Sequence, residues 1–146
     1  MPREQEVIIN DTVGFIRDLP PDLLSAFRAT LEEIGDSNLI IHLVDAANPR
    51  WAQQVESVER ILGELQMAEI PRLMALNKTD LVDAEAIEAM RRQMQTSQRE
   101  CVAISATNAH TLQPLLEKAG AILAHNLVSR FGKKKHYEIE SLSHIA

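Results

Sequence analysis

Four short apolar runs, each followed by a segment with helical periodicity, constrain the fold of this chain most strongly. The runs are Val7–Ile9, Leu39–Val44, Leu73–Leu76 and Cys101–Ile104. Near-continuous apolar runs of this length are typical of parallel strands that are covered on both faces. Their regular alternation with helical segments predicts an α/β fold, in which a three-layer, mainly parallel sheet is flanked by helices and joined by right-handed crossovers.

The segments between the runs carry signals for helix starts and apolar stripes. Helices are expected to begin at Asp22, after Asn48-Pro49, at Asp83 and at Thr111, because capping residues and a first-turn proline stand there. Gly35 is expected to end the first helix. The residues expected to face the sheet are Leu23, Leu24, Phe27, Leu31 and Ile34 in the first helix; Val55, Val58, Leu62 and Leu65 in the second; Ile87, Met90 and Met94 in the third; and Leu112, Leu115, Leu116, Ala119, Ile122 and Leu123 in the fourth.

Composition limits the class of protein. The 146 residues favour one domain with a real core. With one Trp, one Tyr and three Phe, that core must be aliphatic, and the net charge of −6 argues against nonspecific nucleic-acid binding by the whole surface. The single cysteine, Cys101, fits a reducing cytosol and is expected to be a buried, inert thiol. No apolar segment approaches the roughly 18 residues of a membrane span, so we expect a cytoplasmic protein without a membrane partner.

The polar residues that follow the third strand suit a guanine base. Asn77, Lys78 and Asp80 stand at a strand end, where open α/β sheets bind ligands. A carboxylate only accepts, so Asp80 can take both N–H groups on the Watson–Crick edge of guanine. Asn77 can donate to a ring acceptor and tie loops together, and the carbon stem of Lys78 can lie over the base. The alternative is an ordinary surface loop.

Two further strand ends carry residues with related chemistry. Asp11 can hold Mg²⁺ through a water, and Gly14 lets a backbone N–H approach a terminal phosphate. Alone, this D-x-x-G pattern is more often a turn. Ser105-Ala106 follows the fourth strand, so the Ala106 N–H could reach the guanine O6 and the Ser105 hydroxyl could stiffen the loop.

This ordered set resembles signature motifs of translation-factor-related GTPases, and specifically the HflX family. The likeness rests on Asp-Thr-Val-Gly-Phe-Ile-Arg-Asp-Leu-Pro, Leu-Ile-Ile-His-Leu-Val-Asp-Ala-Ala and Asn-Lys-Thr-Asp-Leu, and it covers roughly residues 6–127. The resemblance implies a cytoplasmic, ribosome-associated GTPase that hydrolyses GTP slowly by itself and is accelerated by a partner such as the large ribosomal subunit. It also implies that Asp11 binds Mg²⁺, Gly14 contacts the γ-phosphate, and Asn77, Lys78, Asp80, Ser105 and Ala106 bind the guanine of GTP or GDP.

Two departures from the family pattern affect the expected activity. Phe15 stands where Ras-like enzymes keep the glutamine that orients the attacking water, so no catalytic residue is assigned. Phe15 has an alternative role as an apolar anchor for a loop. After Ser105-Ala106 the family usually has glycines, whereas this chain has Thr107-Asn108-Ala109-His110, of which Asn108 tolerates left-handed geometry.

No G-x-x-x-x-G-K-[ST] motif occurs in these residues. In such GTPases this loop supplies the backbone N–H groups and the lysine that hold the phosphates. We therefore expect residues 1–128 to be a truncated G domain, an incomplete Ras-like fold without its first strand, phosphate loop and second strand. Binding and hydrolysis of GTP by these residues alone should be weak or absent.

The expected loss of a central strand raises the question of how the Val7 strand is paired. Such a loss would expose two rows of unpaired backbone groups. The Val7 strand would then pair directly with Leu39–Val44, pair with another chain, or lie loosely on the surface. Pairing with another chain would produce self-association.

The last segment, 129–146, is expected to be a basic extension. It contains Arg130-Phe131-Gly132-Lys133-Lys134-Lys135-His136, and Tyr137–Glu140 could form a short strand. A solvated tail and a contact with RNA or the ribosome are the two interpretations.

Three functions remain open from the sequence. The first is a fragment of an HflX-like GTPase that keeps its guanine-recognition residues. The second is a non-enzymatic module that contacts the ribosome or another protein, and the third is a nucleotide hydrolase with an unfamiliar phosphate site. His42, amid strand residues, is expected to be a packed core histidine rather than a catalytic one.

Overall fold

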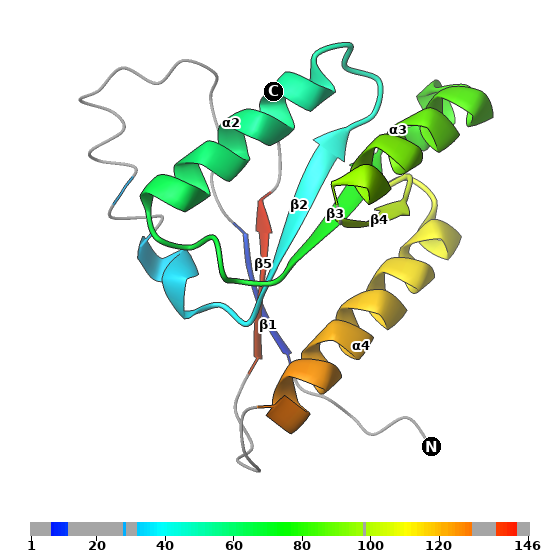
Figure 1. Ribbon diagram of the computed structural model, residues 1–146. Helices are drawn as coiled ribbons and strands as arrows, with labels where there is room; N and C mark the ends of the chain where they lie inside the picture. The colour runs from blue at the N-terminus through cyan, green and yellow to red at the C-terminus, as the bar shows by residue number, and fades with distance from the viewer. Residues whose placement is uncertain (1–6, 12–27, 29–31, 98, 130–136, 143–146) are drawn as a thin grey trace.

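The computed structural model describes residues 7–11, 28, 32–97, 99–129 and 137–142. It is an α/β structure with one five-stranded sheet, and every strand pair in that sheet is parallel. The strands lie side by side in the order β1-β5-β2-β3-β4 (Figure 1). The predicted fold class is therefore confirmed.

All four predicted strands are present, and from β2 onward helices alternate with them. The strands are β1 (Val7–Asp11), β2 (Leu39–Asp45), β3 (Arg72–Asn77), β4 (Glu100–Ala103) and β5 (Tyr137–Leu142). The helices are α2 (Trp51–Glu64), α3 (Ala84–Thr96) and α4 (Leu112–Ser129), with short 3₁₀ turns η1 (Glu33–Asp36), η2 (Thr79–Leu81) and η3 (Ala109–Thr111).

Helices cover both faces of the sheet, which gives the expected three layers. On one face, η1 and α2 pack on Ile40, while α2 and α3 pack around Val44 and Met74. On the other face, α4 packs on Leu39, Ile41, Leu73 and Ala75 through Ala119 and Leu123. The buried core contains aliphatic residues, Cys101 and methionines but no aromatic side chain among the residues described, as the composition predicts.

The predicted stripes hold for α2 and α3 but not throughout α4. Ile87, Met90 and Met94 are buried as expected. Leu116, which the periodicity places on the buried stripe of α4, is 62% exposed. Helical spacing gives the direction of a side chain around the axis, whereas burial also requires a neighbouring element at that height.

Three predicted helix signals act differently from expectation. Asn48 precedes the helix start and accepts the Arg50 N–H at 2.9 Å, so α2 begins at Trp51. Gly35 lies within η1 rather than after it, and Ser37 is the extended residue that ends the turn. Thr111 directs its hydroxyl back toward Ser105 and Asn108 instead of bonding, among the described contacts, to the first turn of α4. The helix expected from Asp22 lies mostly outside the described residues.

The pairing of β1 is a fourth arrangement, different from the three that the sequence suggested. β5 lies between β1 and β2 and pairs with both. Ile139 is the Cα partner of Ile9 on one side and of Leu39 on the other. The two rows of backbone groups expected to be unpaired are therefore occupied by the strand that the sequence allowed at Tyr137–Glu140.

His42 is fully buried in β2, as expected for a core histidine. Burial, with smaller contributions from the positive charges of Arg99 and Arg72, lowers its pKa to about 4, so the imidazole is neutral at pH 7. Neither ring nitrogen has a hydrogen-bond partner among the residues described. Burial likewise raises the pKa of the Cys101 thiol, which disfavours the reactive thiolate.

Candidate functional site

The carboxyl ends of β2, β3 and β4 meet at one edge of the sheet. Asp45, the last residue of β2, is the register partner of Asn77, the last residue of β3. Beyond the strands, the Ala46 N–H donates to the Asn77 carbonyl at 2.9 Å, and the Ile104 N–H donates to the Leu76 carbonyl at 2.7 Å. Three loops therefore start from fixed positions side by side, which is where open parallel sheets bind ligands.

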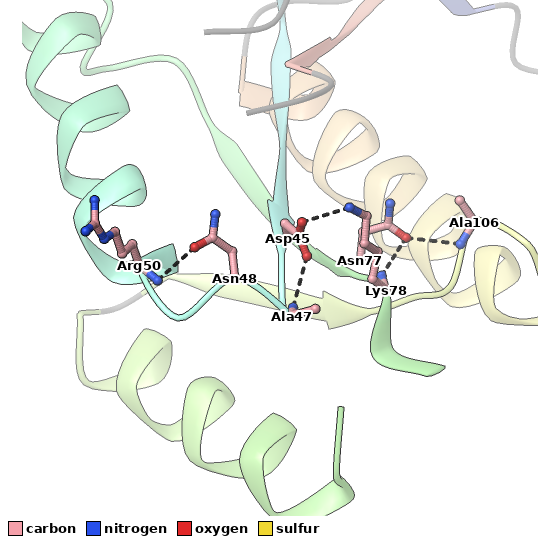
Figure 2. A network of polar contacts seen from close by, with 7 residues as sticks. All are labelled: Asp45, Ala47, Asn48, Arg50, Asn77, Lys78 and Ala106. Atoms are coloured by element: carbon pink, nitrogen blue, oxygen red, sulfur yellow. Dashed lines mark hydrogen bonds and ion pairs between the residues drawn. The ribbon is translucent and has the colours of Figure 1, made fainter. Parts of the chain in front are cut away.

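The Asn77 side chain joins two of these loops. Its Oδ1 accepts the Lys78 N–H at 2.8 Å and the Ala106 N–H at 3.1 Å (Figure 2). Two backbone donors at one oxygen fix the orientation of the amide, so Nδ2 is left to donate elsewhere. The loop-tying role predicted for Asn77 is thus present in the structure.

Asp80 and Ser105 form the second link between the same loops. The Ser105 hydroxyl donates to Asp80 Oδ1 at 2.9 Å and lies 3.0 Å from the Thr107 hydroxyl. Ser105 is buried, whereas Asp80 is exposed. The bond orients a carboxylate that solvent and ligands can still reach.

Lys78 is fixed at both its backbone and its ammonium group. It adopts the left-handed conformation (φ 62°, ψ 33°), which costs a non-glycine residue about 1 kcal/mol. Its Nζ lies 2.8 Å from Asp45 Oδ2, while Asp45 Oδ1 accepts the Ala47 N–H at 3.0 Å (Figure 2). The pair is partly exposed, so its worth to stability is small, roughly 0–1 kcal/mol, but it determines the path of the lysine stem.

Two threonines tie the loops to each other and close the Ser-Ala loop. Thr79 bonds the Ile104 carbonyl through its hydroxyl at 2.8 Å and its N–H at 3.3 Å. The Thr111 hydroxyl accepts the Ser105 N–H at 2.9 Å and lies within donor distance of the Ser105 and Asn108 carbonyls, at 2.9 and 2.7 Å.

The structure brings five of the predicted site residues together. These are Asn77, Lys78, Asp80, Ser105 and Ala106. Asp11 ends β1, which β5 and β2 separate from β3, and its side chain lies outside the described part of the structure. Gly14 and Phe15 lie outside the described residues. Sequence reasoning missed the roles of Asp45, Thr79 and Thr111; only the position of Asp45 at a buried strand end signalled its involvement.

Within the part of the chain that the structure describes, no group of three or more His, Cys, Asp or Glu side chains is arranged to hold a metal ion. None of the described helices combines the length and apolar character needed to cross a membrane.

The chain is similar in sequence to proteins named GTPase HflX. It is 35% identical over 118 residues to the protein of Magnetococcus marinus, which is 81% of this chain and 26% of that protein. It is 37% identical over 128 residues to that of Lacrimispora saccharolytica (88% and 29%), and 45% identical over 78 residues to that of Escherichia coli (53% and 18%). The chain thus spans between 18% and 29% of these relatives' length. No protein-family model matches it.

Proposed function

The chain belongs to the HflX family of GTPases, and from this premise we propose that the joined ends of β3 and β4 bind the guanine base of a nucleotide. Asp80 accepts the N1–H and 2-amino groups, and Asn77 Nδ2 donates to an acceptor on the other side of the ring. The lysine stem, fixed by Asp45 at its end, lies over the base. The observation that carries the proposal is the pair of cross-loop bonds, Ala106 N–H to Asn77 and Ser105 hydroxyl to Asp80.

The Ala106 N–H, which the sequence suggested as a donor to the guanine O6, already has an acceptor in the structure. In the structure this N–H is already donated to Asn77 Oδ1 at 3.1 Å. A guanine O6 therefore either shares the Ala106 N–H with Asn77 Oδ1 or takes the place of Asn77 Oδ1 as its acceptor. Since one N–H is a single donor, the Nδ2 group of Asn77 is the better candidate for an additional bond to the ring.

The phosphate half of the site rests on the family resemblance. Asp11 would hold Mg²⁺ through water, and the ion would neutralise phosphate charge; Gly14 would let backbone approach the γ-phosphate. No phosphate-loop motif is present in these 146 residues, so we propose that they bind GTP or GDP weakly and hydrolyse GTP negligibly by themselves. A cytoplasmic location and the large ribosomal subunit as partner are further parts of the proposal, supported only by the resemblance.

The test is whether substituting Asp80 changes which base the protein prefers. GMP and xanthosine monophosphate differ at C2, where guanine has an amino donor and xanthine a carbonyl acceptor. Asp80→Asn can accept from N1–H and donate to the new carbonyl, so this variant should bind xanthosine monophosphate better than GMP, while the wild type shows the reverse preference. Chemical-shift titrations of labelled protein measure both.

An unchanged preference in Asp80→Asn would exclude the guanine pocket. Such a result would leave the alternative of a non-enzymatic interaction module, because that function has no reason to depend on the Asp80 carboxylate. The exposed Asp83→Asn, three residues further along, is the matched control and should bind both ligands as the wild type does.

A further inference from the structure

We propose that Thr111 is a positioning residue that fixes the plane of the Ser105–Ala106 peptide and thereby aims its N–H at the base. The inference rests on the proposed guanine pocket and adds a residue outside the motifs that suggested it. Thr111 lies at the end of η3, six positions beyond Ser105.

The geometry of this peptide group carries the argument. Its carbonyl end, Ser105 O, lies 2.9 Å from the Thr111 hydroxyl, and its N–H end, on Ala106, points to Asn77 at 3.1 Å. Because a peptide group is planar, holding the carbonyl also fixes the direction of the N–H on the opposite side. Thr111 and Asn77 thus hold the two ends of one rigid unit.

The Thr111 hydroxyl also holds the preceding peptide. It accepts the Ser105 N–H at 2.9 Å, so Ser105 is fixed on both sides of its Cα by one side chain. A hydroxyl has one proton, which the Ser105 carbonyl shares with the Asn108 carbonyl at 2.7 Å. The Asn108 N–H, also 2.9 Å from the Ser105 carbonyl, closes a turn and provides a second, weaker constraint.

This arrangement explains how a loop without glycine can present a backbone N–H. Residues 107–110 contain no glycine, and none of the described non-glycine residues in this loop has positive φ. Side-chain bonds take over instead: Asn108 Oδ1 accepts the His110 N–H at 3.2 Å, and Thr111 spans the loop. In the proposed complex the purine O6 shares the Ala106 N–H with Asn77 Oδ1, so the orientation that Thr111 gives this N–H determines recognition at position 6.

The test compares Thr111→Val with Thr111→Ser. Valine keeps the shape but removes the hydroxyl, whereas serine keeps the hydroxyl. The ligands are GMP and 6-thio-GMP, which share N1–H and the 2-amino group and differ only in the acceptor at position 6. The wild type should prefer GMP by about 2- to 10-fold, the range that one hydrogen bond supplies. Thr111→Val should reduce this ratio toward one, and Thr111→Ser should restore it.

Two controls separate positioning from general stability. Thr96→Val removes a hydroxyl that donates to the Arg92 carbonyl at 3.0 Å at the end of α3, and should leave the ratio unchanged. In the wild type, the Ser105 N–H should exchange slowly with solvent, because Thr111 accepts it and Ser105 is buried. Because this exchange rate is measured on the wild type, it tests the inference even if Thr111→Val fails to fold.

Three results would overturn the inference: an unchanged GMP to 6-thio-GMP ratio in folded Thr111→Val, a failure of Thr111→Ser to restore it, or unprotected exchange of the Ser105 N–H. If Asp80→Asn still alters the base preference, the proposed guanine pocket remains supported and only the role of Thr111 is rejected. If Asp80→Asn has no effect, the pocket and this inference fall together.

Discussion

Single residues of the candidate site are held in place by hydrogen bonds and an ion pair that form without a ligand. Lys78 keeps an unfavourable left-handed backbone because Asn77 accepts its N–H and Asp45 holds its ammonium group. Backbone strain of this kind persists only where the surroundings determine the conformation from several sides. The hydrogen bonds from Ala106 to Asn77 and from Ser105 to Asp80 likewise fix the two loops relative to each other.

His42 provides a prediction about the pH dependence of stability. Its pKa is 6.5 in the unfolded chain and about 4 in the folded protein, so the unfolded chain binds the proton first as pH falls. Protonation of His42 therefore does not affect the free energy of unfolding above about pH 6.5. As pH falls from there toward 4, this free energy decreases by up to roughly 1.4 kcal/mol per pH unit. His42→Leu should remove this part of the slope in urea unfolding measured between pH 7 and 4.5.

The same substitution has an expected sign at neutral pH. Both ring nitrogens of His42 lack partners among the described residues, and a buried unpaired polar group costs about 1–3 kcal/mol. His42→Leu should therefore equal or exceed the wild type in free energy of unfolding at pH 7. His125→Gln, at an exposed position of α4, is the control and should follow the wild-type profile. A variant as pH-dependent as the wild type would contradict the role given to His42.

At the scale of secondary-structure elements, β5 differs in composition from the strands around it. Central strands of parallel sheets are usually apolar throughout, as β2 and β3 nearly are. The sequence of β5, Tyr-Glu-Ile-Glu-Ser-Leu, instead has three polar residues among its six. Its position in the sheet therefore depends on backbone bonds to β1 and β2 more than on apolar composition.

This dependence predicts the effect of a proline in β5. Ile139→Pro removes a backbone donor from a strand that is paired on both sides and should cost about 1–3 kcal/mol of unfolding free energy, because the acceptor on the neighbouring strand is left unpaired. The freed edges of β1 and β2 should then pair between molecules, so sedimentation velocity should show concentration-dependent association. Ile139→Val, which keeps the donor and suits a strand, should remain like the wild type. A proline variant as stable and monomeric as the valine variant would show that β5 is not needed.

The contrast between β5 and the site explains what the sequence could predict. The proximity of Asn77, Asp80, Ser105 and Ala106 could be predicted, because the carboxyl ends of parallel strands share one edge of the sheet. The insertion of β5 could not be predicted, because Ile139 is 130 residues from its partner Ile9 and 100 residues from its partner Leu39, and strand pairing over such separations leaves no local signal. Threonine at a helix start predicts a helix cap, and only the side-chain geometry shows that the Thr111 hydroxyl bonds back to Ser105 instead.

In the whole molecule, the described residues contain the proposed base-recognition edge, and the sequence contains no phosphate-loop motif for the triphosphate. Phosphate groups contribute most of the charge-assisted bonds to a nucleotide, and those bonds are the strong ones. In these 146 residues, the lysine of the site is already paired with Asp45, and the phosphate-loop motif is absent. The base contacts should therefore account for nearly all of the binding free energy.

The resulting prediction concerns GMP and GTP. The 146-residue protein should bind both with similar, roughly millimolar dissociation constants, because added phosphates find no dedicated donors. Titrations followed by chemical shifts, with and without Mg²⁺, measure this directly, and Lys78→Met should weaken both ligands to the same extent. A GTP affinity in the micromolar range that depends on Mg²⁺ and is lost in Asp11→Asn would contradict the prediction. It would mean that residues outside the described part of the structure supply a phosphate site, with Asp11 as its magnesium ligand.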